Sequence, residues 1–77
     1  MNIDLEKTYN AHEVLQENFL YWIKSYPTLT KWIRQDKENW HILNATIIGT
    51  GTATRYFIRG ENILRFVASF EDGSLHS

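Results

Sequence analysis

No cysteine occurs in this chain of 77 residues, so neither a disulfide framework nor a thiolate metal site can hold its fold. A chain of this length forms one domain at most, because it buries only about 60 per cent of the surface that its unfolded form exposes. Its single thin core must therefore come from packing alone. Hydrophobic residues make up 43% of the sequence and aromatic residues 14%, which is enough for such a core and excludes a disordered polar chain.

The formal net charge is −1, which argues against a generic nucleic-acid binder, since such domains commonly carry a basic excess. The charges are unevenly distributed, however. Residues 1–20 hold one lysine against four acidic residues, residues 21–65 hold seven basic residues against three acidic ones, and residues 66–77 add two acidic ones. Any nucleic-acid surface should therefore be sought in the middle segment.

Targeting signals are absent from the sequence as it stands. Its first residues lack the basic start and long apolar run of a signal peptide, and no stretch approaches the ~20 apolar residues that a membrane span needs. Together with the lack of cysteine, this predicts a soluble, unprocessed protein of the bacterial cytoplasm, with no membrane partner.

The first helix signal is Asn10 followed three residues later by Glu13, which is the spacing of a capping box. A helix should begin near Ala11 and run to about Lys24, because the apolar residues that follow recur at helical spacing. A break between two shorter helices near Asn18 stays open. The apolar face comprises Val14, Leu15, Phe19, Trp22, Ile23 and Tyr26.

Ser25 and Pro27 mark a second helix start, since Ser is a favoured N-cap and Pro is tolerated in the first turn. This helix is expected from about Tyr26 to Lys37, with Leu29, Trp32 and Ile33 facing inward. Two helices joined by so tight a turn form a helix-turn-helix unit. The outer face of the second helix carries Thr28, Thr30, Lys31, Arg34 and Gln35.

Two runs rich in β-branched and aromatic residues, 45–48 and 55–58, flank the segment 49–54, whose glycines permit a turn, and so predict a β-hairpin. A final helix from about Gly60 to Phe70 should follow and stop at Asp72-Gly73. The expected fold class is thus α+β, in the order helix, turn, helix, two-stranded hairpin, helix. Residues 1–8 are assigned to a flexible arm, 9–72 to the domain and 73–77 to a tail.

Three stretches of sequence resemble the MerR-like excisionase family of small DNA-binding proteins from mobile genetic elements. They are 9–14 (Tyr-Asn-Ala-His-Glu-Val), 25–34 (Ser-Tyr-Pro-Thr-Leu-Thr-Lys-Trp-Ile-Arg) and 54–58 (Thr-Arg-Tyr-Phe-Ile). The resemblance implies a winged helix-turn-helix whose second helix enters the major groove of duplex DNA while the hairpin, or wing, contacts the backbone or the minor groove. The DNA contacts that it implies are Tyr26, Thr28, Thr30, Lys31 and Arg34 on the helix, and Thr52, Thr54 and Arg55 on the wing.

The chain departs from the family pattern by several extra residues between Glu13 and Ser25. They lengthen the first helix or build a contact surface that simpler relatives lack. This favours a second hypothesis, in which the domain is a non-catalytic accessory subunit of a larger DNA-processing protein, such as a mobile-element polymerase or an integrase. The candidate partner contacts are Phe19, Tyr21, Trp22 and Trp40.

Catalytic and ligand-binding signals are weak throughout. The pair His12-Glu13 lacks the second histidine of a metalloprotease motif, and the glycines of segment 49–54 lead into a strand instead of the Lys-Ser/Thr and helix of a phosphate-binding loop. No carboxylate pair or Ser/His/Asp grouping stands out. We therefore expect no enzyme activity, no metal, no cofactor and no small-molecule ligand. The first hypothesis is a recombination or transcription factor that binds duplex DNA.

Overall fold

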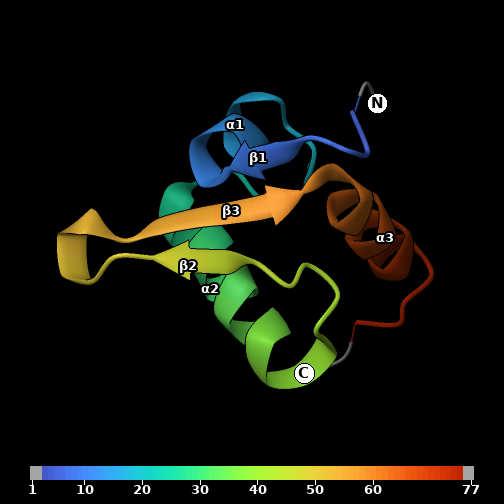
Figure 1. The fold of residues 1–77 in the computed structure, drawn as a ribbon. Coiled ribbons are helices and arrows are strands. Elements are labelled where there is room, and N and C mark those ends of the chain that lie inside the picture. The colour runs from blue at the N-terminus through green and yellow to red at the C-terminus, as the bar shows by residue number, and fades with distance from the viewer. Residues whose placement is uncertain (1–2, 76–77) are drawn as a thin grey trace.

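The computed structural model describes residues 3–75 and contains three α-helices and one three-stranded antiparallel sheet within them (Figure 1). This confirms the predicted α+β class. The elements in chain order are β1 (Thr8–Asn10), α1 (Ala11–Gln16), α2 (Tyr26–Gln35), the π-helical turn η1 (Asp36–Trp40), β2 (Thr46–Ile48), the 3-10 turn η2 (Gly51–Ala53), β3 (Arg55–Arg59) and α3 (Gly60–Glu71).

The predicted hairpin is present, with β2 and β3 paired antiparallel and Ile48 opposite Arg55. Its connection needs glycine, because Gly49 has φ 91° and Gly51 has φ 59°, a region that other residues rarely adopt. A Cβ atom at Gly49 would also lie 2.5 Å from the carbonyl oxygen of Ala53. The hairpin tip is therefore closed by backbone geometry that only glycine satisfies without strain.

Strand β1 was not predicted from the sequence. It pairs with β3, placing Tyr9 opposite Ile58, so the sheet order is β1-β3-β2. A strand of three residues is too short to show a convincing alternation, and its pairing partner is distant in the sequence. The sheet therefore has β3 at its centre, with Tyr56 and Ile58 facing the core.

The first helix is much shorter than expected, since α1 ends at Gln16. The prediction of a helix reaching Lys24 is wrong because Asn18 adopts a left-handed conformation with φ 55°, which an asparagine tolerates better than most residues. The break near Asn18 is thus present, but turns follow it where a second helix was considered. Phe19 and Ile23 are still buried, because these turns deliver their side chains to the core.

The capping box and the second helix follow the prediction closely. Asn10 Oδ1 accepts the Glu13 N–H at 2.8 Å, and Glu13 Oε1 accepts the Asn10 N–H at 3.1 Å. Ser25 is the N-cap residue of α2, although its hydroxyl bonds the Thr28 hydroxyl at 2.8 Å and not a backbone amide. On α2, Leu29 and Ile33 are fully buried as expected.

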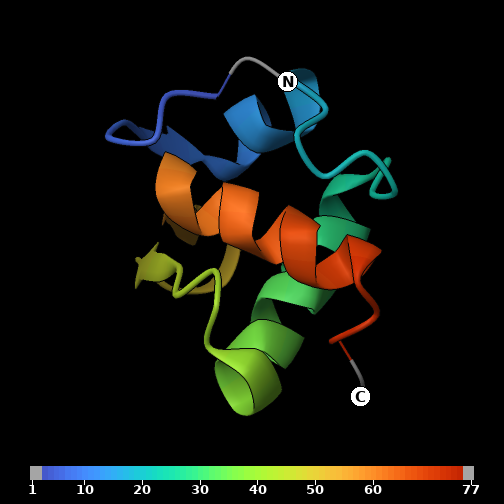
Figure 2. The same ribbon diagram turned by 90° about the vertical axis from the view of Figure 1, so that its right-hand side faces the viewer.

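Helix α3 completes the core and crosses in front of α2 in the view of Figure 2. Ile63 and Phe66 are fully buried, and Phe66 belongs to an aromatic cluster that links α3 to α2 and to the turns after α1. Trp32 is half-buried. Its ring meets that of Phe66 edge-on, with the centroids 6.0 Å apart. The cluster consists of Trp22, Trp32, Trp40, Phe66 and Phe70.

The path from α2 to β2 is fixed by Asp36, which is fully buried. Its carboxylate accepts three backbone N–H groups, from Ile42 at 2.8 Å, Leu43 at 3.1 Å and Asn44 at 3.0 Å. A buried carboxylate is stable only with such partners. The segment between α2 and β2 is therefore an anchored turn.

Backbone N–H groups at the start of α3 donate hydrogen bonds to the chain that precedes β1. Gly60 N–H donates to the Lys7 carbonyl at 2.8 Å and Glu61 N–H donates to the Leu5 carbonyl at 3.1 Å, which provides acceptors for two amides that a helix start leaves unpaired. A Cβ at Gly60 would lie 1.9 Å from the Asp4 carbonyl oxygen. Of the predicted arm and tail, residues 1–2 and 76–77 lie outside the described residues.

Candidate nucleic-acid interface

A groove of about 550 Å³ lies between the start of α1, the start of α2 and the hairpin. It brings together four of the residues predicted to bind DNA, namely Tyr26 from α2 and Thr52, Thr54 and Arg55 from the hairpin. The remaining lining residues are Asn10, Ala11, His12, Ala53, Tyr56 and Phe57. Side chains separated by more than twenty positions thus share one concave surface.

Aromatic contacts hold the two walls of this groove in place. The His12 ring stacks on Tyr26 with centroids 4.9 Å apart and an angle of 20° between planes, and Tyr26 meets Tyr56 at 6.4 Å. His12 is exposed, Tyr26 is half-buried and Tyr56 is buried. His12 was not among the predicted contacts, because nothing local in a sequence reveals a stack between residues fourteen positions apart.

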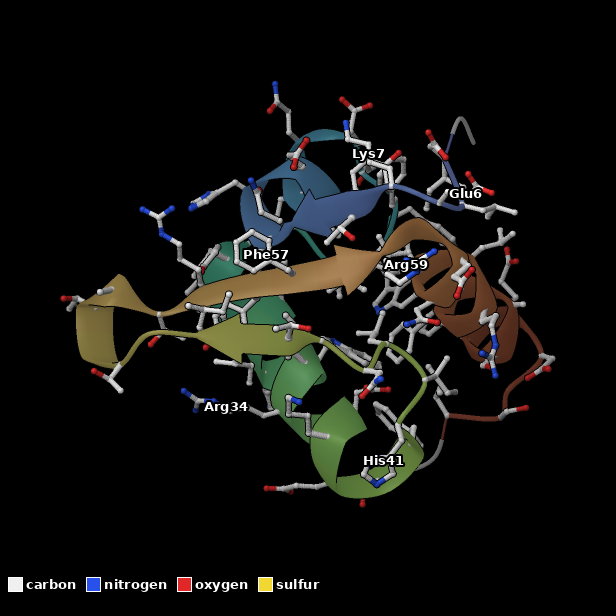
Figure 3. All side chains as sticks on the ribbon, viewed as in Figure 1. Glu6, Lys7, Arg34, His41, Phe57 and Arg59 are labelled. Carbon is white, nitrogen blue, oxygen red and sulfur yellow. The ribbon has the colours of Figure 1, made fainter. Side chains whose placement is uncertain are left out.

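The outer face of α2 presents Thr28, Lys31 and Arg34, which are all exposed and spaced three residues apart on adjacent turns of the helix. Arg34 points toward the side of the molecule to which the hairpin projects (Figure 3). Thr30 and Gln35 are half-buried. The Thr30 hydroxyl donates to the Pro27 carbonyl at 2.9 Å, so that group already has a partner within the helix.

Positive charge prevails on this side of the domain. The sequence carries no acidic residue from 18 to 35 or from 39 to 60. Within residues 3–75 the ion pairs are Lys7 with Glu13 and Arg59 with Glu61, both at 3.6 Å, and neither involves α2 or the hairpin tip. Lys31, Arg34 and Arg55 therefore keep their charge for an anionic partner.

The wing threonines differ in their roles. The Thr54 hydroxyl donates to the Gly51 carbonyl at 2.8 Å and helps to close the 3-10 turn. Thr52 lies at the exposed tip of that turn. A hydroxyl on an exposed turn can donate to a phosphate oxygen, which positions a protein on DNA without reading sequence.

The four aromatic residues predicted to contact a protein partner do not form one surface. Phe19 is only 2% exposed and meets Tyr9 edge-on at 5.0 Å, so its assignment to a contact surface is wrong: it fills the core beneath β1. Trp22 stacks on Phe70 with centroids 3.7 Å apart, and Trp40 lies 5.8 Å from Phe66. Both are half-buried.

Tyr21 is the member of this group that stays exposed, at 41%. Its hydroxyl donates to Glu71 Oε2 at 3.3 Å. Partial desolvation of the hydroxyl and the negative charge of Glu71 raise the pKa of Tyr21 above its ordinary value. The residue thus lies beside the end of α3, away from the groove.

Comparisons with protein-family models, with curated proteins and with solved structures gave no match to this chain. The resemblance to excisionases therefore stays a prediction. No helix in residues 3–75 is long and apolar enough to cross a membrane. Within the same residues, no group of three or more His, Asp or Glu side chains is arranged to hold a metal ion.

Proposed function

We propose that this domain binds duplex DNA as a winged helix-turn-helix, with α2 as the recognition helix and the β2–β3 hairpin as the wing. The observation that carries the proposal is the convergence of Tyr26, Thr52 and Arg55 on one groove, flanked by the exposed cations of α2. These elements come from separate parts of the chain. Their grouping matches the two contacts that the excisionase resemblance implies.

Each group has a distinct task in this docking. Arg34 and Lys31 are suited to phosphate oxygens or to the acceptor edge of guanine in the major groove, and Thr28 offers an adaptable hydroxyl. Arg55 and Thr52 would meet the backbone beside the helix contact. Tyr26 contacts Tyr56 of β3 and stacks on His12 of α1, so it links the start of α2 both to the wing strand and to the first helix.

The net charge of −1 does not oppose this function. The molecule measures 34 × 28 × 21 Å, whereas charges in physiological salt are screened beyond about 8 Å. Acidic residues at the far end are therefore screened from a phosphate at the groove, while Glu13, which lies beside the groove through its bond to Asn10, is paired with Lys7. The local balance of charge decides the interaction, and it is positive.

The test is duplex DNA binding by fluorescence anisotropy, using a pool of random sequences followed by the sequences that the protein enriches. With Lys31, Arg34 and Arg55 each neutralising a phosphate, the logarithm of the affinity should fall with the logarithm of salt concentration at a slope of about −3. The double variant Lys31→Ala/Arg34→Ala should lose at least about tenfold in affinity, and its slope should become shallower by about 2.

Arg65→Ala is the matched control, since Arg65 is an exposed cation on α3, outside the groove and the outer face of α2. It should leave both affinity and slope unchanged. Equal losses from Arg65→Ala and from the double variant would mean that binding is diffuse. An unchanged double variant would reject α2 as the recognition helix.

A further inference from the structure

Exposed apolar side chains gather along α3 as well as on the hairpin. Leu5 (44% exposed), Leu64 (43%) and Tyr21 (41%) lie along α3, whereas Ile47 and Ile48 belong to β2. Leu5 is next to the start of α3, because its carbonyl accepts the Glu61 N–H. Tyr21 is next to the end of α3, through its bond to Glu71.

Leu64 lies between these two positions, on the exposed face of α3 together with Ala68. Leu64 and Ala68 are four residues apart and therefore share one side of the helix, and Glu71 follows on the same side at its end. The helix has twelve residues, so this apolar ridge is about 18 Å long at most. A ridge of this length can contact about three turns of an amphipathic partner helix.

The border of the ridge is acidic. Asp4 and Glu6 flank Leu5 in the sequence, and Glu71 and Asp72 lie at the other end. Glu61 forms an ion pair with Arg59, the residue before α3. Arg65 is an exposed cation within α3 itself. An apolar ridge with this border attracts a basic partner and disfavours pairing with its own copy, because like charges would then meet.

The location of α3 leaves the DNA-binding side free. Helix α3 lies at the end of the molecule opposite the hairpin tip (Figure 1), and in the view of Figure 2 it is the element closest to the viewer. A partner on its outer face would not cover Arg34, which points toward the hairpin side in Figure 3. DNA and a protein can therefore be held together.

We propose that the outer face of α3, with Leu5, Leu64 and Tyr21 as apolar contacts, docks a basic amphipathic helix of a partner protein. The acidic border selects the charge of that helix, and the ridge receives its leucine-type side chains. Of the surface between Phe19 and Trp22 that the sequence predicted, this proposal keeps Tyr21 and adds Leu5 and Leu64. It does not depend on the DNA-binding proposal.

The experiment uses the full chain, labelled with ¹⁵N, and a synthetic 18-residue helical peptide of leucine and lysine with leucines on one face. A second peptide has glutamate in place of every lysine. The basic peptide should shift the amide signals of α3 and of Tyr21, leave α2 and the hairpin unchanged, and bind at least about tenfold more tightly than the acidic one.

Two variants test the ridge. Leu64→Asp should weaken binding of the basic peptide at least about tenfold. Ile48→Asp, at an apolar position on β2 that is more exposed than Leu64, should leave peptide affinity unchanged. Glu6→Lys, which reverses the charge at an exposed position of the acidic border, should lower affinity for the basic peptide and raise it for the acidic one. It keeps the test valid if Leu64→Asp fails to fold, as judged from the dispersion of its amide spectrum.

Three outcomes would overturn the proposal: signals that move on α2 or the hairpin, equal affinity for both peptides, or a dimer in sedimentation that Leu64→Asp dissolves, which would assign the ridge to a second copy. The double variant Lys31→Ala/Arg34→Ala should bind the basic peptide normally. Failure of DNA binding and failure of peptide binding are therefore distinguishable.

Discussion

The hairpin end and the α3 end of this small domain differ in how they are held. In the hairpin, every residue from Thr46 to Arg55 is exposed or half-buried, and its shape depends on glycine geometry and a threonine-capped turn. Helix α3, in contrast, buries Ile63 and Phe66 completely. The part of the hairpin that carries Thr52, Thr54 and Arg55 thus contributes little to the core, which is common for binding elements.

The largest expected effect lies at the α3 end. Phe66→Ala should destabilise the fold by about 3–5 kcal/mol, because it opens a cavity beneath the aromatic cluster. For a domain with marginal stability, this leaves a large unfolded fraction. Urea denaturation followed by tryptophan fluorescence measures it. Leu64→Ala, at an exposed position of the same helix, should change stability by less than about 1 kcal/mol; similar losses from both would contradict the assigned core.

The next effect concerns the turn between α2 and β2. Asp36→Ala removes the acceptor of three backbone N–H groups, and one buried unsatisfied donor alone costs about 1–3 kcal/mol. Asp36→Asn should retain part of the stability, since its one carbonyl oxygen can still accept from Ile42 and Leu43 while its amide group faces the Asn44 N–H. Thermal unfolding ranks the three proteins, and an Asn variant as stable as the wild type would show that the second oxygen is dispensable.

The hairpin end should respond in DNA binding more than in stability. Gly49→Ala places a methyl group against the Ala53 carbonyl at a positive φ, so it should distort the tip at a cost of about 1–2 kcal/mol and weaken DNA binding. Gly51→Ala is the matched control, because a methyl group at this position would meet no neighbouring group of residues 3–75 within 4 Å and only its φ is unfavourable. Anisotropy and thermal unfolding of both variants separate steric from conformational strain.

The smallest effect concerns Tyr21 and depends on pH. Its pKa is raised in the folded state above the ordinary value of 10.0, so the unfolded chain loses the phenol proton first as the pH rises. Stability should therefore fall, relative to the Tyr21→Phe variant, as the pH passes upward through 10.0 and the raised folded pKa. Urea midpoints of both proteins between pH 8 and 11 measure this difference; parallel curves would show that folding does not raise the pKa of Tyr21.

The sequence predicted those elements whose signals are local. The Asn10–Glu13 capping box, the α2 start at Ser25 and the glycine turn of the hairpin each depend on residues a few positions apart. The end of α1 was missed because the apolar spacing of Phe19 and neighbouring residues is the same in a helix and in turns that reach the core. Strand β1 and the His12–Tyr26 stack depend on tertiary contacts that no local pattern encodes.

The candidate site shows the same division. The sequence indicated which helix and which turn carry the cationic and hydroxyl groups, and the structure brings Tyr26, Thr52, Thr54 and Arg55 to one groove. It misplaced the protein-contact surface, because exposure of an aromatic residue is a property of packing. Phe19 is in the core while Leu64, an ordinary apolar position in a helical stripe, is exposed.

If the domain binds DNA as proposed, Asp36 restricts the spacing of the sites that it can bind. One carboxylate ties the end of α2 to the residues that lead into β2. It therefore fixes where the hairpin begins relative to the helix. A DNA site would then have to present its two contact points at one fixed separation. A site with another spacing would bind more weakly whatever its base sequence, because the helix and the hairpin could not reach both contact points at once.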